Sequence, residues 1–190
     1  MINIYYIIFT SIIIWLIIPF RQLGNKYFYY FLFLAIMDPI SIFFRWILNS
    51  PTNYFYIPLS FLALISLLGT NTLKKYRILI IILILIVFIM NFSYIISIRF
   101  FLFMSITHLL ILFYFLKDFI VGFFKSKIFD IFLMLLIFYE LTIVTKNLNL
   151  ISGFADAHFY FFITSILEIL IGLFFCFFKT DNPRFILQFK

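Results

Sequence analysis

Long apolar runs separated by short polar stretches dominate this sequence. The runs are about 17–24 residues long, and a transmembrane helix needs about 20 apolar residues to cross a hydrocarbon core of ~30 Å. The loops between them are too short to form a core of their own. The pattern therefore predicts an all-α, polytopic transmembrane bundle that forms a single domain over residues 1–190. Its seven predicted helices cover about residues 4–20, 27–48, 54–73, 78–95, 100–116, 128–145 and 155–178.

The boundary between the fourth and fifth runs is the least distinct. Only Asn91, Ser93, Ser97 and Arg99 interrupt the apolar sequence there. A single helix over residues 78–116 would be about 58 Å long at ~1.5 Å per residue. That length is nearly twice the thickness of the hydrocarbon core. Two helices joined by a tight turn fit better, so seven helices are favoured over six.

The positions of the basic residues predict the orientation of the bundle. Arg99 and Lys146 fall on one face of the predicted topology, and Arg45 lies within the second helix. Basic loops stay on the cytoplasmic side of a membrane, so the N-terminus is expected outside and the C-terminus inside. The opposite face, which is thus expected to be cytoplasmic, carries eleven of the fourteen Lys and Arg residues: Arg21, Lys26, Lys74, Lys75, Arg77, Lys117, Lys125, Lys127, Lys179, Arg184 and Lys190.

The composition agrees with a lipid environment. Of the 190 residues, 66% are hydrophobic and 11% are charged, whereas a soluble domain averages about 45–50% apolar and about 25% charged residues. The lipid bilayer is therefore the first expected partner. The net charge of +7 comes from basic clusters between apolar runs, as in membrane topology signals, so nucleic acid is not expected as a partner.

Few residues could support metal, cofactor or covalent chemistry. Cys176 is the single cysteine, which excludes an internal disulfide and a CxxC redox pair. Two histidines without an HExxH spacing make a zinc site improbable. We therefore assign no catalytic residue, no metal ligand and no cofactor, and an enzyme is the less favoured class.

Five ionisable residues lie inside the predicted helices. A charge at the bilayer centre costs several kcal/mol, so such residues usually face the interior of the bundle and pair with one another. Counting from the helix ends puts three of them near mid-membrane. The candidate intramembrane polar pocket consists of Asp38, Arg45, His108, Glu140 and Glu168. Within it, we expect Asp38 to interact with Arg45 through a water and Glu168 to share a proton with His108.

Polar residues are more frequent in the outward halves of the predicted helices, where converging faces would line a cavity open to the outside. The inward halves are almost unbroken Phe, Leu and Ile, as in residues 109–116 and 169–178. Buried charges also often serve only to tie helices together, and that interpretation stays open. Intramembrane hydrolysis is a weaker third reading, because it requires a metal triad or a nucleophile beside a base.

Two functions follow from these observations. The first is a non-enzymatic accessory or regulatory subunit that acts through helix contacts with other membrane protein subunits. It is supported by the lack of a catalytic motif and of extramembrane domains. The alternative is a carrier or sensor of a small solute, cation or proton, with an outward-facing polar pocket.

The layout resembles a loose group of small seven-helix membrane proteins from AT-rich Bacteroidetes genomes. The resemblance rests on Asp38 in the second helix, on the Asn-rich loop that leads into an aromatic helix start over residues 49–56, and on the basic inner loops. It implies the seven-helix topology and a bacterial inner membrane rather than an organelle membrane, and it supplies no activity.

Overall fold

The chain folds into a helical bundle with a small strand pair at one end. The computed structural model describes residues 4–48, 53–92, 97–180 and 182–188. The two strands pair antiparallel, with Phe129 opposite Leu187. The all-α fold class is confirmed. In chain order the elements are α1 (Ile4–Arg21), α2 (Phe28–Leu48), α3 (Asn53–Ser66), α4 (Thr70–Lys75), α5 (Arg77–Phe92), α6 (Ser97–Ser126), β1 (Ile128–Asp130), α7 (Ile131–Ser152), α8 (Ala157–Phe177), η1 (Pro183–Phe185) and β2 (Ile186–Gln188).

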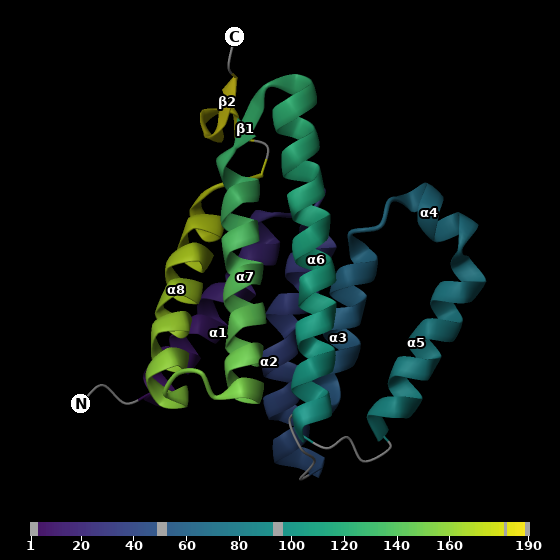
Figure 1. Ribbon diagram of the computed structural model, residues 1–190, viewed down its shortest axis with the longest axis vertical. Coiled ribbons are helices and arrows are strands. Elements are labelled where there is room, and N and C mark those ends of the chain that lie inside the picture. Colours follow the sequence, from purple (N-terminus) through teal and green to yellow (C-terminus); the bar gives the residue numbers. More distant parts are fainter. Residues whose placement is uncertain (1–3, 49–52, 93–96, 181, 189–190) are drawn as a thin grey trace.

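Helices α1, α2, α3, α6, α7 and α8 lie side by side, whereas α5 stands apart and packs mainly against α3 (Figure 1). The bundle has two ends, which we call the α6–β1 end and the α7–α8 end after the connections found there. The α7–α8 end also holds the beginning of α1, the end of α2 and the beginning of α3 (Figure 1).

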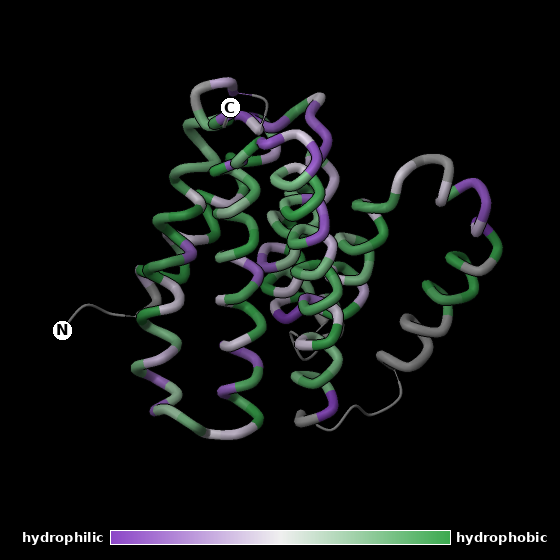
Figure 2. Tube along the Cα trace, turned by 45° about the horizontal axis from the view of Figure 1, so that its top comes forward, coloured by the Kyte–Doolittle hydropathy of each residue, from purple (hydrophilic) through white to green (hydrophobic). Residues whose placement is uncertain are grey.

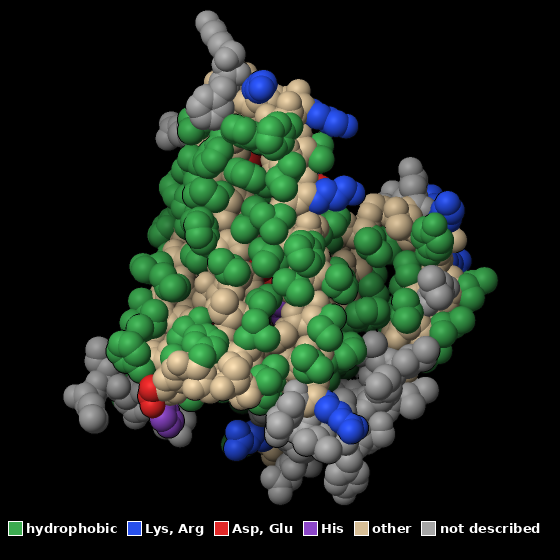
Figure 3. All heavy atoms as spheres, viewed as in Figure 1, with side chains coloured by type: hydrophobic (Ala, Val, Ile, Leu, Met, Phe, Trp, Pro, Cys, Tyr) green, Lys and Arg blue, Asp and Glu red, His purple; other side chains and the backbone are tan. Residues whose placement is uncertain are grey.

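Four helices in the described ranges are long and apolar enough to cross a membrane: residues 28–47 of α2, residues 99–126 of α6, and the whole of α7 and α8. Apolar residues run along the length of the bundle (Figure 2). On the face shown in Figure 3, apolar side chains cover most of the flank, and many Lys and Arg side chains gather near the α6–β1 end and around α4. Phe20 and Trp46 are 79% and 91% exposed. So much exposed apolar surface suits contact with a lipid bilayer.

The α1–α8 packing depends on a glycine. A Cβ atom added at Gly172 would lie 2.9 Å from Ile14 Cγ2 and 3.3 Å from Trp15 Nε1. Small residues let membrane helices approach closely and gain dispersion contacts. The thiol of Cys176, one turn further along α8, lies 3.4 Å from the carbonyl oxygen of Ile14. Cys176 is therefore part of the packing between these helices.

Aromatic side chains fill the bundle on the side of the α6–β1 end. Tyr30, Phe31, Phe115, Phe132 and Phe175 are at most 1% exposed and belong to one cluster. Their rings meet mostly at steep or tilted angles, with centroids 4.7–6.3 Å apart. Aromatic rings prefer such arrangements because of their quadrupoles. This half of the bundle is thus closed by large apolar side chains.

Gln22 ties the end of α8 to the α1–α2 connection. Its side-chain amide donates to the carbonyl oxygens of Phe175 and Phe178 at 2.9 and 2.7 Å. Its side-chain oxygen, Oε1, accepts a hydrogen bond from Asn25 Nδ2 at 2.9 Å, and the whole side chain is buried. The last carbonyls of a helix have no partner within the helix, and Gln22 supplies one across the bundle.

Two helices end later along the chain than the hydropathy pattern predicts. Helix α6 continues to Ser126 instead of about residue 116, and α7 continues to Ser152 instead of about residue 145. The helix propensity of Lys and Asn differs from that of Leu by only a few tenths of a kcal/mol, so a drop in hydropathy does not end a helix. Gly153 does so for α7, with a left-handed φ of 64° that favours glycine.

The third apolar run, predicted as one helix over residues 54–73, is divided. Helix α3 ends at Ser66, and the short α4 begins after Gly69, whose backbone is extended. The fourth run corresponds to α5, which ends at Phe92. The junction predicted at residues 91–99 and the Asn-rich loop from residue 49 lie partly outside the described residues.

Candidate functional site

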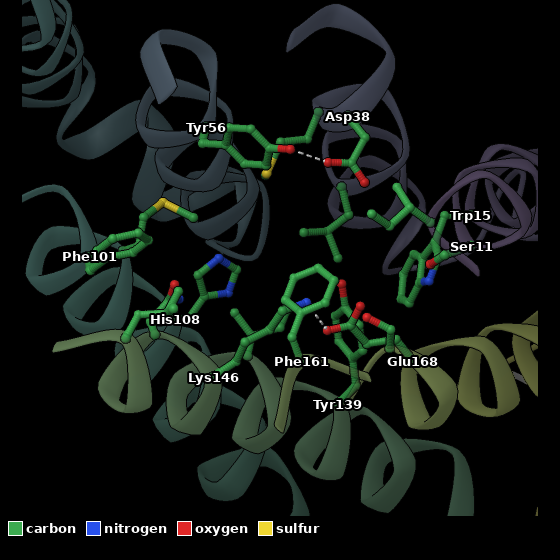
Figure 4. A pocket seen from close by; sticks show the side chains of 18 of the residues that line it. Ser11, Trp15, Asp38, Tyr56, Phe101, His108, Tyr139, Lys146, Phe161 and Glu168 are labelled. Carbon is green, nitrogen blue, oxygen red and sulfur yellow. Dashed lines mark hydrogen bonds and ion pairs between the residues drawn. The ribbon is translucent and has the colours of Figure 1, made fainter. Parts of the chain in front are cut away.

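A cavity of about 380 Å³ lies in the half of the bundle nearer the α7–α8 end. Six helices contribute to its wall: α1, α2, α3, α6, α7 and α8. The aromatic cluster of the α6–β1 end closes the bundle on the opposite side. The lining combines aromatic and apolar side chains with a few ionisable ones (Figure 4), among them Trp15, Met37, Asp38, Tyr56, Phe100, Phe101, Met104, His108, Tyr139, Lys146, Phe161, Ser165 and Glu168.

Asp38 of α2 lies on one side of the cavity, next to Tyr56 of α3. The Tyr56 hydroxyl donates a hydrogen bond to Asp38 Oδ1. Figure 4 shows the other oxygen of Asp38 turned toward the middle of the cavity. Among the residues that the structure describes, no Lys, Arg or His lies within ion-pair distance of this carboxylate. The Asp38 carboxyl group therefore lines the cavity with a neutral hydrogen-bond donor, the Tyr56 hydroxyl, as its partner.

Lys146 of α7 and Glu168 of α8 form an ion pair on the opposite side, with 3.0 Å between Lys146 Nζ and Glu168 Oε1. The Lys146 ammonium also lies 4.2 Å from the centroid of the Phe161 ring. The side chains of Lys146 and Glu168 are 19% and 15% exposed, so solvent screens this ion pair only in part. An aromatic face attracts a cation through its quadrupole. This cavity thus already holds one ammonium between a carboxylate and an aromatic ring.

A second ionisable pair reaches the cavity from inside the bundle. His108 Nδ1 of α6 lies 2.8 Å from Glu140 Oε2 of α7, and the Tyr30 hydroxyl of α2 donates to Glu140 Oε1. His108 Nε2 is 3.3 Å from Ser60 Oγ of α3. All four side chains are at most 1% exposed. One hydrogen-bonded chain therefore links four helices, with His108 as its member on the cavity wall.

The five residues of the predicted pocket are only partly brought together. Asp38, His108 and Glu168 line the cavity, and Glu140 lies behind His108 as its partner. Arg45 is exposed and is not part of the cavity wall. It lies two helical turns, about 10 Å, beyond Asp38 along α2. The expected Asp38–Arg45 and Glu168–His108 interactions are replaced by others. Asp38 pairs with Tyr56, and Glu168 pairs with Lys146.

Sequence reasoning missed Tyr30, Tyr56 and Lys146. The tyrosines stand in apolar runs without a distinguishing pattern. The fall in hydropathy at Lys146 predicts a loop there, whereas α7 continues to Ser152. The missed signal is the spacing of Lys146 from other residues of α7. Tyr139, Ile143 and Lys146 stand four and three residues apart, which puts them on one face of a helix, and all three line the cavity.

A second cavity, of about 610 Å³, lies at the α6–β1 end around Lys26. Lys26 Nζ is 2.6 Å from Asp118 Oδ2. Partial burial lowers the pKa of Lys26, but the hydrogen bond to Asp118 and the neighbouring tyrosines outweigh it, so this pKa lies above its ordinary value. Burial raises the pKa of Tyr27 to about 12. Lys26 thus stays a cation that is already neutralised by Asp118.

The geometry can bind and orient a solute through charge and aromatic contacts. Within the described ranges, no group of three His, Cys, Asp or Glu side chains is placed to hold a metal ion. The chain matches no protein-family model, no curated protein and no solved structure. Its fold and its cavity are therefore the observations from which a function is inferred.

Proposed function

We propose that this protein is a membrane-embedded binding protein that holds a small polar solute in the cavity near the α7–α8 end. One observation carries the proposal: Asp38, His108 and the Lys146–Glu168 pair meet around a single cavity within an otherwise apolar bundle. Ionisable groups among membrane helices are costly, and they often mark substrate or ion pathways. Apolar walls with a few convergent polar groups are typical of small-molecule sites.

The proposal includes a topology. In it, α1, α2, α3, α5, α6, α7 and α8 cross the membrane, with the N-terminus outside and the C-terminus inside, in a bacterial inner membrane. The exposed side chains of Lys26, Lys117, Lys125 and Lys127 at the α6–β1 end support this orientation, because basic segments remain on the cytoplasmic side. The cavity is then reached from outside.

The closed half of the bundle favours a sensor or receptor over a channel. Phe31, Phe115, Phe132 and Phe175 fill the space between the cavity and the α6–β1 end. Among the residues that the structure describes, the hydrogen bonds that lead from His108 through Glu140 end at the Tyr30 hydroxyl within this aromatic cluster. A carrier would have to separate these rings, as the rocking of one half against the other does in transporters. We therefore expect binding without passive conduction.

Thermal unfolding of the detergent-purified protein with a panel of small solutes tests the proposal. The panel contains small amines, carboxylates, sugars and zwitterionic amino acids. A ligand that binds the folded state alone raises the midpoint, and above its Kd the gain in stability grows with the logarithm of the ligand concentration. At least one class should stabilise the wild type and the Ser126→Phe control, but not Ser165→Phe, which puts a ring on the cavity wall. Stabilisation of Ser165→Phe to the same extent would contradict the proposal, as would a lack of response to every class.

A second candidate, an accessory or regulatory subunit of a larger membrane assembly, is favoured by α5. This helix packs mainly on α3, and Ile78 and Leu85 on it are 75% and 55% exposed. An apolar helix at the edge of a bundle can contact either lipid or another subunit. Purification in mild detergent followed by mass spectrometry should then recover a stoichiometric partner, and a clean monomer would exclude this candidate.

A further inference from the structure

The cavity is chemically asymmetric across its two sides. On one side, an ammonium of the protein itself, Lys146, lies between Glu168 and the ring of Phe161. On the other side, Asp38 lies beside the aromatic Tyr56 and has no basic partner within the described part of the chain. Both sides thus offer a carboxylate next to an aromatic ring, and only one of them is matched by a cation of the protein.

The summed charge of the wall is negative. Lys146 and Glu168 cancel each other. Glu140 accepts a hydrogen bond from Tyr30 and is paired with His108, so that acid–base pair adds no net positive charge. Asp38 adds one negative charge. A monocation would neutralise it, whereas an anion would bring a second negative charge into a site of low dielectric, where like charges repel strongly.

The rest of the wall favours an organic cation over a metal ion. Trp15, Tyr56, Phe100 and Tyr139 present aromatic surface, and Met104 adds a flexible thioether. The quadrupole of an aromatic face attracts an ammonium group, and methionine adapts to ligands of different shape. A bare metal ion would instead need several oxygen ligands around it.

We propose that the solute is a small organic ammonium ion with an apolar or aromatic body, and that Asp38 is its counter-ion. The ammonium lies between the free oxygen of Asp38 and the ring of Tyr56, as Lys146 lies between Glu168 and Phe161. The apolar body of the ligand contacts Phe100, Phe101 and Met104. This inference rests on the proposed function and specifies its ligand class.

Three probes with the same phenylethyl group and different charges test the inference: 2-phenylethylammonium, neutral 2-phenylethanol and the anion 3-phenylpropionate. Binding to the purified wild type is measured by calorimetry and by the fluorescence of Trp15 in a Trp46→Phe background. The ammonium should bind at least about tenfold more tightly than either analogue, a difference of about 1.4 kcal/mol. Equal binding of the three probes, or no binding of the ammonium, would overturn the inference.

Two variants locate the contact. Asp38→Asn should lose about tenfold or more of the ammonium affinity, while Asp156→Asn, at the exposed N-cap of α8, should keep it. Lys146→Met removes the competing cation and leaves Glu168 free, so the ammonium affinity should rise. This gain of binding keeps the inference testable even if Asp38→Asn does not fold. Unchanged affinity in Lys146→Met or in a folded Asp38→Asn would refute the assigned site.

The outcomes separate this inference from the proposed function. If an anionic or neutral solute stabilises the wild type and Ser165→Phe abolishes the effect, the cavity binds a solute and the ammonium inference alone fails. If Ser165→Phe changes the stabilisation by no solute of any class, the proposed function and the ammonium inference fail together.

Discussion

His108 Nδ1 lies 2.8 Å from Glu140 Oε2, and both side chains are almost completely buried where α6 packs against α7. Glu140 also accepts from Tyr30 of α2, and His108 contacts Ser60 of α3. A polar chain inside an apolar bundle has no water to replace a lost partner, so it favours one relative placement of its helices. These hydrogen bonds therefore favour one arrangement of α2, α3, α6 and α7 around the cavity.

Glu140→Gln should destabilise the protein by about 1–3 kcal/mol, the cost of leaving a buried hydrogen-bonding group without its partner. The amide presents an NH₂ group to one of the two donors that the carboxylate accepts from. Tyr30→Phe removes a single donor and should cost less. Unfolding by denaturant in lipid nanodiscs measures both. Thr142→Val on the same helix, whose hydroxyl bonds only to the carbonyl oxygen of Phe138, is the control, and an equal loss in this control would contradict the assignment.

Gln22→Leu should loosen the end of α8, because the carbonyl oxygens of Phe175 and Phe178 lose their donor. The expected loss of stability is about 1–3 kcal/mol, with faster hydrogen exchange in the last turn of α8 than in its middle. Gln188→Leu, an exposed position in β2, should change stability by less than about 0.5 kcal/mol. Unchanged exchange at the end of α8 would show that Gln22 does not cap it.

Asp130→Asn should make the protein less sensitive to pH. Burial raises the pKa of Asp130 above 3.8, although backbone N–H groups of Leu133 and Phe132 lower it in part. The folded state thus holds this proton more tightly than the unfolded chain, so the associated stability is complete below about pH 3.8 and is lost as the pH rises through the raised pKa. Asn caps a helix as well as Asp does, so the variant keeps the bond to the Leu133 N–H.

Denaturant unfolding between about pH 3 and about pH 8 measures this effect. The variant should gain stability relative to the wild type as the pH rises, with no gain at the acidic end. Asp156→Asn is the matched control, because Asp156 caps α8 in the same way at an exposed position. A wild type that becomes more stable with pH relative to Asp130→Asn would reverse the assigned sign.

Cysteine labelling tests the orientation. In a Cys176→Ala background, single cysteines at Lys75 and Lys125 should react from the cytoplasmic side, and those at Ser152 and His158 from the outside. All four positions are exposed. An impermeant maleimide applied to intact cells should block only the second pair. Labelling of Lys125 and Ser152 variants from the same side would refute the topology, because α7 lies between them.

The sequence by itself determined the fold class and the approximate place of the long helices. Apolar runs of membrane-spanning length leave a chain few alternatives, because every backbone N–H and C=O in lipid must bond within its own segment. The ends of the helices were less predictable. Helix α6 passes the predicted boundary at Leu116 and continues through Lys117 and Asp118, since leaving the apolar region changes the solvent and does not break the backbone bonds.

Only the tertiary structure decided which polar residues meet. Depth along a helix follows from counting residues, and this placed Asp38, His108 and Glu168 near one level. The direction of each side chain depends on the rotation of its helix against its neighbours, and one residue changes that direction by about 100°. The pairing of Glu168 with Lys146 and of His108 with Glu140 is therefore a property of the packed bundle. Arg45, close to Asp38 in sequence, is separated from the cavity by the rise of its own helix.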